Sequence, residues 1–165
     1  AREGRLNLLL GGRDADIDEV EPILATFSEN RFRTGALGTA HTIKLINNFL
    51  SLGHAALAAE AAATAEAAGV DPGILRDVVT VGGADSRMFR MVMPYVTDGD
   101  ETSLEFAIAN AMKDYGYYLD VAREAGTVPQ TAPAIHRLYA LATALGRGGE
   151  HVPHLYDMLK GLRVG

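Results

Sequence analysis

The apolar positions of this chain change their spacing once, and the change divides the sequence into two parts. Leu6 to Leu10 form a short apolar run closed by two glycines, which is typical of a buried strand. Apolar residues then recur at helical spacing from Asp14 to Phe27, and a second short strand is predicted at 31–34. Residues 1–35 are therefore predicted to form a strand, a helix and a strand, as at the end of an α/β layer.

From residue 36 onward the pattern is helical throughout. A long helix rich in alanine and leucine is predicted from Thr39 to Ala68, and its alanines indicate close packing of small residues between helices. Further helices are predicted at 72–81, 86–93, 104–125, 132–145 and 153–162. We expect a mainly α protein, in which a short α/β segment (1–35) precedes a helical bundle (36–165) that begins with the long helix.

Composition excludes several classes of function. The chain of 165 residues has no cysteine, so it holds no disulfide, thiol nucleophile or thiolate metal site. A net charge of -6 without a basic tract argues against nucleic acid and against an anionic membrane as partners. The alanine run is interrupted by Glu60 and Glu66, so no membrane-spanning segment is predicted, and we expect a cytoplasmic protein. The opening, a charged stretch followed directly by an apolar run, predicts a chain that begins within a domain.

Two adjacent asparagines in the long helix need a reason, because asparagine forms helices poorly. At about 100° per residue the large apolar side chains (Ile43, Leu45, Ile46, Phe49, Leu50, Leu52 and Leu57) fill one half of the helix. Lys44, Asn47 and Asn48 share the other half with His41, Ser51 and His54. This half is either a solvated surface or the wall of a polar cleft, in which a lysine can exchange a proton and asparagines can orient a substrate.

A second group of residues falls on the helix expected from Leu104. Phe106, Asn110, Lys113 and Tyr117 are spaced at i, i+4, i+7 and i+11, on one face. The alternative to a functional face is a lysine whose stem lies along core aromatics while its ammonium reaches water. Asp114 is expected to be a surface charge that points elsewhere.

No metal site is predicted, since none of the five histidines forms a ligand pair with a supporting carboxylate. His151 and His154 are three apart but flank a proline. The stretch GALGTA follows a strand and opens a helix, yet it lacks the full glycine fingerprint of a dinucleotide site. A tight turn onto a helix N-terminus is expected there, with N–H groups able to face an anion.

These motifs together resemble those of the β-hydroxyacid dehydrogenase family, which includes 3-hydroxyisobutyrate dehydrogenase and tartronate semialdehyde reductase. The resemblance rests on Gly35-x-x-Gly38 followed by Lys44-x-x-Asn47-Asn48, and on Lys113-Asp114 seven residues after Phe106. The family's second motif is usually Lys-Asp-Leu, whereas this chain has Tyr115 in the third place. The resemblance extends over almost the whole chain.

The resemblance implies a role for each matching residue. Lys44 would be the catalytic group that exchanges a proton with the substrate oxygen, while Asn48 and Asn47 would orient the substrate. Lys113 and Phe106 would contact the cofactor, NAD or NADP. The fold implied is a helical domain of the 6-phosphogluconate dehydrogenase C-terminal type, preceded by the last elements of a nucleotide-binding domain.

The resemblance also implies a function: hydride transfer between a nicotinamide cofactor and a small 3-hydroxy acid or its semialdehyde, in a homodimer or larger homo-oligomer. Because the glycine fingerprint is missing, the chain by itself is expected to be inactive. Two alternatives remain open. One is a reductase of other carbonyl or imine substrates on the same fold, and the other is a non-catalytic helical dimerisation domain.

Overall fold

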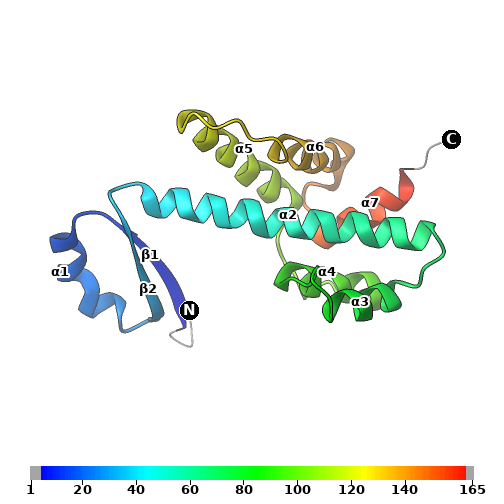
Figure 1. Cartoon of the computed structure of the whole chain (residues 1–165), viewed down its shortest axis with the longest axis horizontal. Helices are drawn as coiled ribbons and strands as arrows, with labels where there is room; N and C mark the ends of the chain where they lie inside the picture. Colours follow the sequence, from blue (N-terminus) through cyan, green and yellow to red (C-terminus); the bar gives the residue numbers. More distant parts are fainter. Residues whose placement is uncertain (1–4, 163–165) are drawn as a thin grey trace. The chain divides into compact units, whose positions relative to one another are not determined.

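Strand β1, Leu6–Gly11, pairs in parallel with strand β2, Ser28–Gly35, and helix α1, Asp14–Leu24, joins them (Figure 1). A computed structural model describes residues 5–162 of the chain. It divides into two compact units, residues 1–47 and 48–165. The predicted strand, helix and strand are therefore confirmed, with α1 ending three residues earlier than expected.

Charged side chains fasten α1 to β2. Glu21 of α1 accepts hydrogen bonds from Arg31 at 3.0 Å and from Arg33 at 3.1 Å, both on β2. The Arg31 hydrogen bond is the main reason why the pKa of Glu21 lies below its usual value. Arg33 also donates to Asp18 at 2.6 Å. These contacts link the helix to one strand of the sheet at its surface, where each ion pair contributes little.

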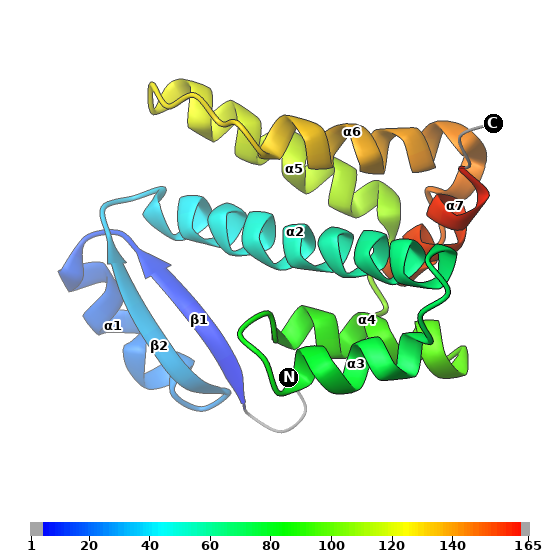
Figure 2. The same ribbon diagram turned by 45° about the vertical axis from the view of Figure 1, so that its right-hand side comes forward.

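Helix α2, Thr39–Ala67, is the long helix that the sequence predicts. The remaining helices are α3, Pro72–Thr80; α4, Arg87–Asp98; α5, Ile108–Glu124; α6, Ala132–Ala142; and α7, Leu155–Gly161. In the 48–165 unit, α5 and α6 lie along one side of α2, and α3 and α4 lie along the other (Figures 1 and 2). No helix between residues 5 and 162 is long and apolar enough to cross a membrane.

The ends of α6 and α4 also differ from the sequence prediction. Helix α6 ends at Ala142, and the chain keeps turning through Thr143 until it breaks at Gly146, which takes a left-handed conformation with φ of 83°. Helix α4 runs five residues beyond the predicted 93, through Pro94. Its start is as expected, since the Ser86 side chain caps it by accepting from the Phe89 N–H at 3.0 Å.

The core of the 48–165 unit forms around the small residues of α2. Its buried positions are Leu52, Gly53, Ala55, Ala56, Ala58, Ala59, Ala62 and Ala63. Small side chains let neighbouring helices approach the backbone of α2 closely, so the larger buried residues come from α4 to α7, as Met93, Ile108, Tyr139 and Leu155 do. The sequence prediction of small-residue packing is confirmed.

The large apolar residues of α2 are a correction to the sequence prediction. Ile43, Ile46, Leu50 and Leu57 fill the expected apolar half, yet each is between 41% and 59% exposed. The buried face of the helix is formed by Leu52, Gly53 and the alanines instead. Periodicity alone ranks large apolar residues above alanine, whereas close helix packing favours the smallest side chains.

Two buried tyrosines donate hydrogen bonds to backbone carbonyls of α2. The Tyr115 hydroxyl of α5 donates to the Phe49 carbonyl at 2.8 Å, and the Tyr139 hydroxyl of α6 donates to the Leu52 carbonyl at 2.8 Å. Burial raises the pKa of both hydroxyls. Gly53 makes the first contact possible, because a Cβ atom there would lie 2.8 Å from the Tyr115 hydroxyl oxygen.

Replacing Gly53 by alanine should therefore destabilise the protein, although alanine is the better helix former. We expect the clash with Tyr115 to cost about 1–3 kcal/mol in the free energy of unfolding, as overpacking usually does. Gly116→Ala is the matched control, since the nearest atom to its added Cβ is 3.9 Å away. That variant should gain about 0.5–1 kcal/mol. Denaturant unfolding of both variants tests this, and equal stabilities would contradict it.

Stability should also fall in alkaline solution. The folded state keeps the protons of Tyr115 and Tyr139 where the unfolded chain loses them, near pH 10. The contribution of these raised pKa values to the free energy of unfolding is therefore complete below about pH 10. It decreases as the pH rises further, by about 1.4 kcal/mol per pH unit for each tyrosine.

Tyr139→Phe separates this effect from general alkaline unfolding. We expect it to lose about 1 kcal/mol at pH 7, where one hydrogen bond is missing, and to show a shallower decline above pH 10. Thermal unfolding at a series of pH values measures both quantities. An unchanged alkaline slope in the variant would show that Tyr139 does not contribute to it.

Candidate functional site

The start of α2 is set by two glycines in left-handed conformations. Gly35 has φ of 108° and Gly38 has φ of 96°, values that side chains rarely allow. The Thr39 hydroxyl then donates to the Ala36 carbonyl at 2.7 Å. The tight turn predicted from GALGTA is thus present, and it directs the first turns of α2 past strand β1.

Lys44 lines a small pocket inside the 1–47 unit. The pocket has a volume of about 310 Å³ and is formed by Ala40, His41 and Lys44 of α2 and by Asn7, Leu8 and Leu9 of β1. Lys44 is exposed. Asn7 accepts a hydrogen bond from Asn30 through its side-chain oxygen at 2.8 Å, which leaves its NH₂ group as the donor. The pocket therefore offers donors and a cation, and no carboxylate lines it.

Asn47 and Asn48 differ in their surroundings although they are adjacent. Asn47 is exposed, whereas Asn48 is half-buried. The Asn48 side-chain nitrogen donates to the Asp114 carboxylate on α5 at 2.7 Å. Asn48 follows Lys44 by one helical turn, as the sequence predicts for residues four apart.

Asp114 is a correction to the sequence prediction, which made it a surface charge. Its side chain is only 15% exposed, and it faces α2 because α5 packs against that helix. The adjacent Tyr115 is fully buried at the same junction. Helical spacing from Phe106 and Lys113 could not reveal this contact, because its partner lies 66 residues earlier in the chain.

Lys113 presents its ammonium group to solvent beside Asp114. Its side chain is 53% exposed, and its Nζ lies 3.7 Å from Asp114 Oδ1. The same nitrogen lies 6.0 Å from the centre of the Tyr117 ring, at the outer limit of a cation–π contact. The ammonium is thus accessible to an anionic or polar ligand. The same geometry also agrees with the alternative of a lysine whose stem lies along aromatic residues.

The predicted position of Phe106 on the helix of Lys113 is also corrected by the structure. Phe106 does not share a helical face with Lys113, since α5 begins at Ile108 and not at 104. Ala107 is extended, with φ of -67° and ψ of 140°, and forms a bridge with His151. The Phe106 carbonyl accepts from the Val152 N–H at 2.8 Å. Pairing with residues 151–152 holds this segment extended and packs the Phe106 ring against the core.

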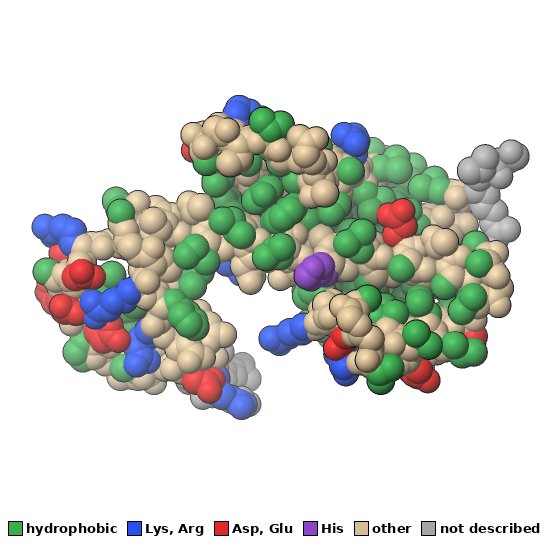
Figure 3. Space-filling model, viewed as in Figure 1, with side chains coloured by type: hydrophobic (Ala, Val, Ile, Leu, Met, Phe, Trp, Pro, Cys, Tyr) green, Lys and Arg blue, Asp and Glu red, His purple; other side chains and the backbone are tan. Residues whose placement is uncertain are grey.

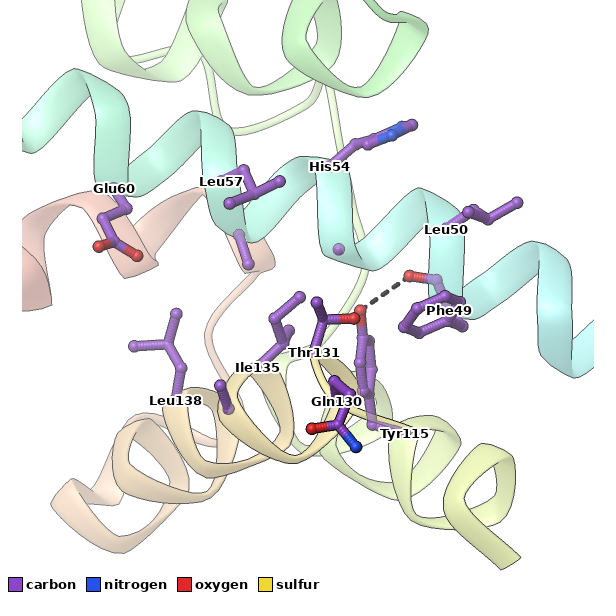
Figure 4. Close-up of a pocket in the computed structure, with 13 residues that line it drawn as sticks. Phe49, Leu50, His54, Leu57, Glu60, Tyr115, Gln130, Thr131, Ile135 and Leu138 are labelled. Carbon is purple, nitrogen blue, oxygen red and sulfur yellow. Dashed lines mark hydrogen bonds between the residues drawn. The ribbon is translucent and has the colours of Figure 1, made fainter. Parts of the chain in front are cut away.

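A larger apolar groove lies between α2 and the α5–α6 pair. It has a volume of about 540 Å³, and Leu50, Leu57, Ile135 and Leu138 are among the residues that line it (Figure 4). Figure 3 shows hydrophobic side chains gathered over these helices. None of the residues predicted for the site lines the groove. Phe49 and Tyr115, which also line the groove, are the sequence neighbours of Asn48 and Asp114. The groove and the Asn48–Asp114 contact therefore use different side chains of the same two helices.

His154 takes part in a structural cluster. Its Nδ1 lies 3.0 Å from the Tyr95 hydroxyl, which donates to Asp157. Burial and this carboxylate raise the pKa of Tyr95. The cluster joins α4 to α7. Within residues 5–162, no three His, Asp or Glu side chains are grouped as metal ligands.

Comparison with known proteins places these residues in a family. Residues 38–159 match the family model described as "NAD-binding of NADP-dependent 3-hydroxyisobutyrate dehydrogenase". The chain is 32% identical to L-threonate dehydrogenase of Cupriavidus necator, over 99% of this chain and 55% of that protein. It is also 32% identical to 3-sulfolactaldehyde reductase of Escherichia coli, over 88% of this chain and 49% of that protein.

Solved structures agree with the sequence relatives. The 3-hydroxyisobutyrate dehydrogenase of Salmonella typhimurium superposes with a TM-score of 0.86 and 30% identity, over 96% of this chain and 55% of that chain. The chain thus spans about half the length of the relatives it matches. The matched region includes Lys44, Asn48 and Lys113 and extends over most of the chain. This chain therefore belongs to the 3-hydroxyisobutyrate dehydrogenase family.

Proposed function

We propose that this chain supplies the helical part of an NAD(P)-dependent dehydrogenase that acts on a small 3-hydroxy acid or its semialdehyde. In this proposal residues 1–35 are the end of the nucleotide-binding domain. Residues 36–165 form a helical domain of the 6-phosphogluconate dehydrogenase C-terminal type. The observation that carries it is the Asn48–Asp114 contact beside Lys113, because it brings together residues of two family motifs that are 66 positions apart in sequence.

Lys44 is the proposed proton-transfer group. Its ammonium can donate a proton to a carbonyl oxygen as the carbonyl is reduced, and its neutral amine can accept the proton of a hydroxyl as the hydroxyl is oxidised. The pocket lined by Lys44, His41 and Asn7 suits an oxygen-rich, anionic substrate, since these side chains offer donors and positive charge. Asn48, one turn later, and Asn47 are proposed to orient the substrate.

Lys113 is the proposed contact to the cofactor, with Phe106 as a neighbouring wall. The nicotinamide would supply the hydride acceptor or donor. The residues present fit such a partner in one respect, because the Lys113 ammonium is accessible and its ion-pair partner, the Asp114 carboxylate, lies 3.7 Å away. The sequence has no complete GxGxxG, so this chain offers a cation rather than the backbone turn that holds a pyrophosphate. We therefore propose that the chain alone does not turn over substrate.

Relatives named for L-threonate and 3-sulfolactaldehyde support a small, oxygen-rich, acidic substrate. Reduction of other carbonyl or imine compounds on the same fold is the alternative chemistry. A homodimer or larger assembly is part of the proposal, because Leu50 and Leu57 leave apolar surface exposed in the groove between α2 and α6.

Substitution of Lys44 tests the proposed chemistry in the complete enzyme that contains this chain. Against a panel of 3-hydroxy acids with NAD and with NADP, Lys44→Ala should lower kcat by about 100-fold or more on the best substrate. Lys44→Arg should be as impaired, since arginine keeps the charge but does not release its proton. Recovery of near wild-type kcat by the arginine variant would show that charge alone matters and would refute proton transfer.

Substitution of Lys113 tests the cofactor contact. Lys113→Ala should raise the apparent KM for the cofactor and leave the substrate KM nearly unchanged. Its free energy of unfolding should change by less than about 0.5 kcal/mol, as for other surface positions. Steady-state kinetics with the cofactor varied, together with denaturant unfolding, measure both. A marked loss of stability with unaltered kinetics would instead identify Lys113 as a packing residue.

A further inference from the structure

Asp114 lies beside two candidate residues of the 48–165 unit, Asn48 and Lys113, and faces each with a different oxygen. Its Oδ2 accepts from the Asn48 side-chain nitrogen at 2.7 Å, and its Oδ1 lies 3.7 Å from Lys113 Nζ. The carboxylate is 15% exposed, so water competes little for it. Nothing in the family resemblance assigns it a role beyond its place in the second motif.

The contact determines which way the Asn48 amide faces. A carboxylate has no hydrogen to donate, so the group that faces Asp114 must be the NH₂ of Asn48. The opposite orientation would place the amide oxygen against a carboxylate oxygen, and two acceptors repel. The Asn48 carbonyl oxygen is therefore left as an acceptor, and within residues 5–162 no side chain donates to it.

The hydrogen bond contributes more to this arrangement than the ion pair does. Lys113 is half exposed, and an exposed pair at 3.7 Å is screened by water. The Asn48 contact is shorter, half-buried and directed at a charged acceptor. The residues that follow Asn48 and Asp114 are also hydrogen-bonded to each other, since the Tyr115 hydroxyl donates to the Phe49 carbonyl. The two helices can therefore hold the amide in one orientation.

We infer that Asp114 is a positioning residue, which holds Asn48 so that its carbonyl oxygen meets a hydrogen-bond donor of the substrate. This inference rests on the proposed substrate role of Asn48. A hydroxyl group of the substrate can donate to that oxygen, whereas a carboxylate group cannot. Asn48 thus selects the hydroxyl end of a hydroxy acid, and the anionic end is bound by other residues.

The orientation can be tested on this chain without cofactor or substrate. The Asn48 side-chain NH₂ signals in a ¹⁵N–¹H NMR spectrum should be widely separated and slow to exchange with water. Asp114→Ala should move them to the positions of the exposed Asn47 amide and speed their exchange. Asp120→Ala is the matched control, since Asp120 lies on the same helix and pairs with Arg123 at its surface. Identical Asn48 signals in the Asp114 variant and the wild type would overturn the inference.

The functional consequence is measured in the complete enzyme by a double-mutant cycle. Asp114→Ala should lower kcat/KM for the hydroxy acid about 10-fold, in line with loss of a hydrogen bond to a charged group, and leave the cofactor KM within about twofold. In the Asn48→Ala background the same change should have no further effect. Asp114→Asn should fall between, because an amide at 114 can accept the bond in only one of its two orientations.

The outcomes separate the two proposals. If Asn48→Ala alone leaves the kinetics unchanged, the proposed role of Asn48 fails, and Asp114 has no substrate contact to position. If Asn48→Ala impairs the enzyme and the Asp114 effect is simply additive to it, the substrate role stands and the positioning role is refuted. A fall in kcat/KM for the hydroxy acid that is matched by an equal rise in the cofactor KM would likewise refute positioning, since a general structural defect affects both ligands.

Discussion

The close approach of α5 and α6 to the small-residue face of α2 is the constraint on which the 48–165 unit depends. Alanine and glycine bring the neighbouring helices near enough for tyrosine hydroxyls to reach the α2 backbone. A backbone carbonyl oxygen has two lone pairs, so it can accept the tyrosine hydroxyl in addition to its helical N–H. The buried hydroxyls of Tyr115 and Tyr139 each have a hydrogen-bond partner in this way. Larger residues at these positions would separate the helices and leave the hydroxyls buried without partners.

The same approach explains how a polar residue comes to be fixed within a helical bundle. Asn48 lies next to Phe49, whose carbonyl accepts from Tyr115, and Asp114 lies next to Tyr115. The Phe49 ring also stacks on Tyr118 at 4.2 Å between ring centres. Aromatic packing thus fixes the distance between α2 and α5, and the amide–carboxylate contact is a consequence of that distance. The family motif usually has leucine where this chain has Tyr115, and leucine could not donate to the α2 backbone.

The two family motifs place their lysines in different surroundings. Lys44 lies on the first turns of α2 beside strand β1, in a pocket of the 1–47 unit. Lys113 lies on α5, where its ammonium is exposed and Asp114 is its nearest charged neighbour. The lysines therefore have different neighbours: Lys44 lies beside Asn7 and His41 in the pocket, and Lys113 lies beside Asp114.

Sequence alone determined the class of the elements and their order, and it indicated the family. The strand–helix–strand segment, the long helix and most helix boundaries follow from apolar spacing, caps and glycines, because these signals act over a few residues. The motif Lys44-x-x-Asn47-Asn48 indicated the family, which the comparisons confirmed.

Tertiary structure decided what periodicity could not. Which face of α2 is buried depends on how closely its neighbours pack, so the alanines are inside while Ile43 and Leu50 are exposed. The start of α5 at Ile108 depends on the pairing of Ala107 with His151, 44 positions later in the chain. The Asp114 carboxylate accepts its hydrogen bond from Asn48, 66 residues away. Each of these facts rests on a contact between distant parts of the chain, and local sequence patterns carry no information about such contacts.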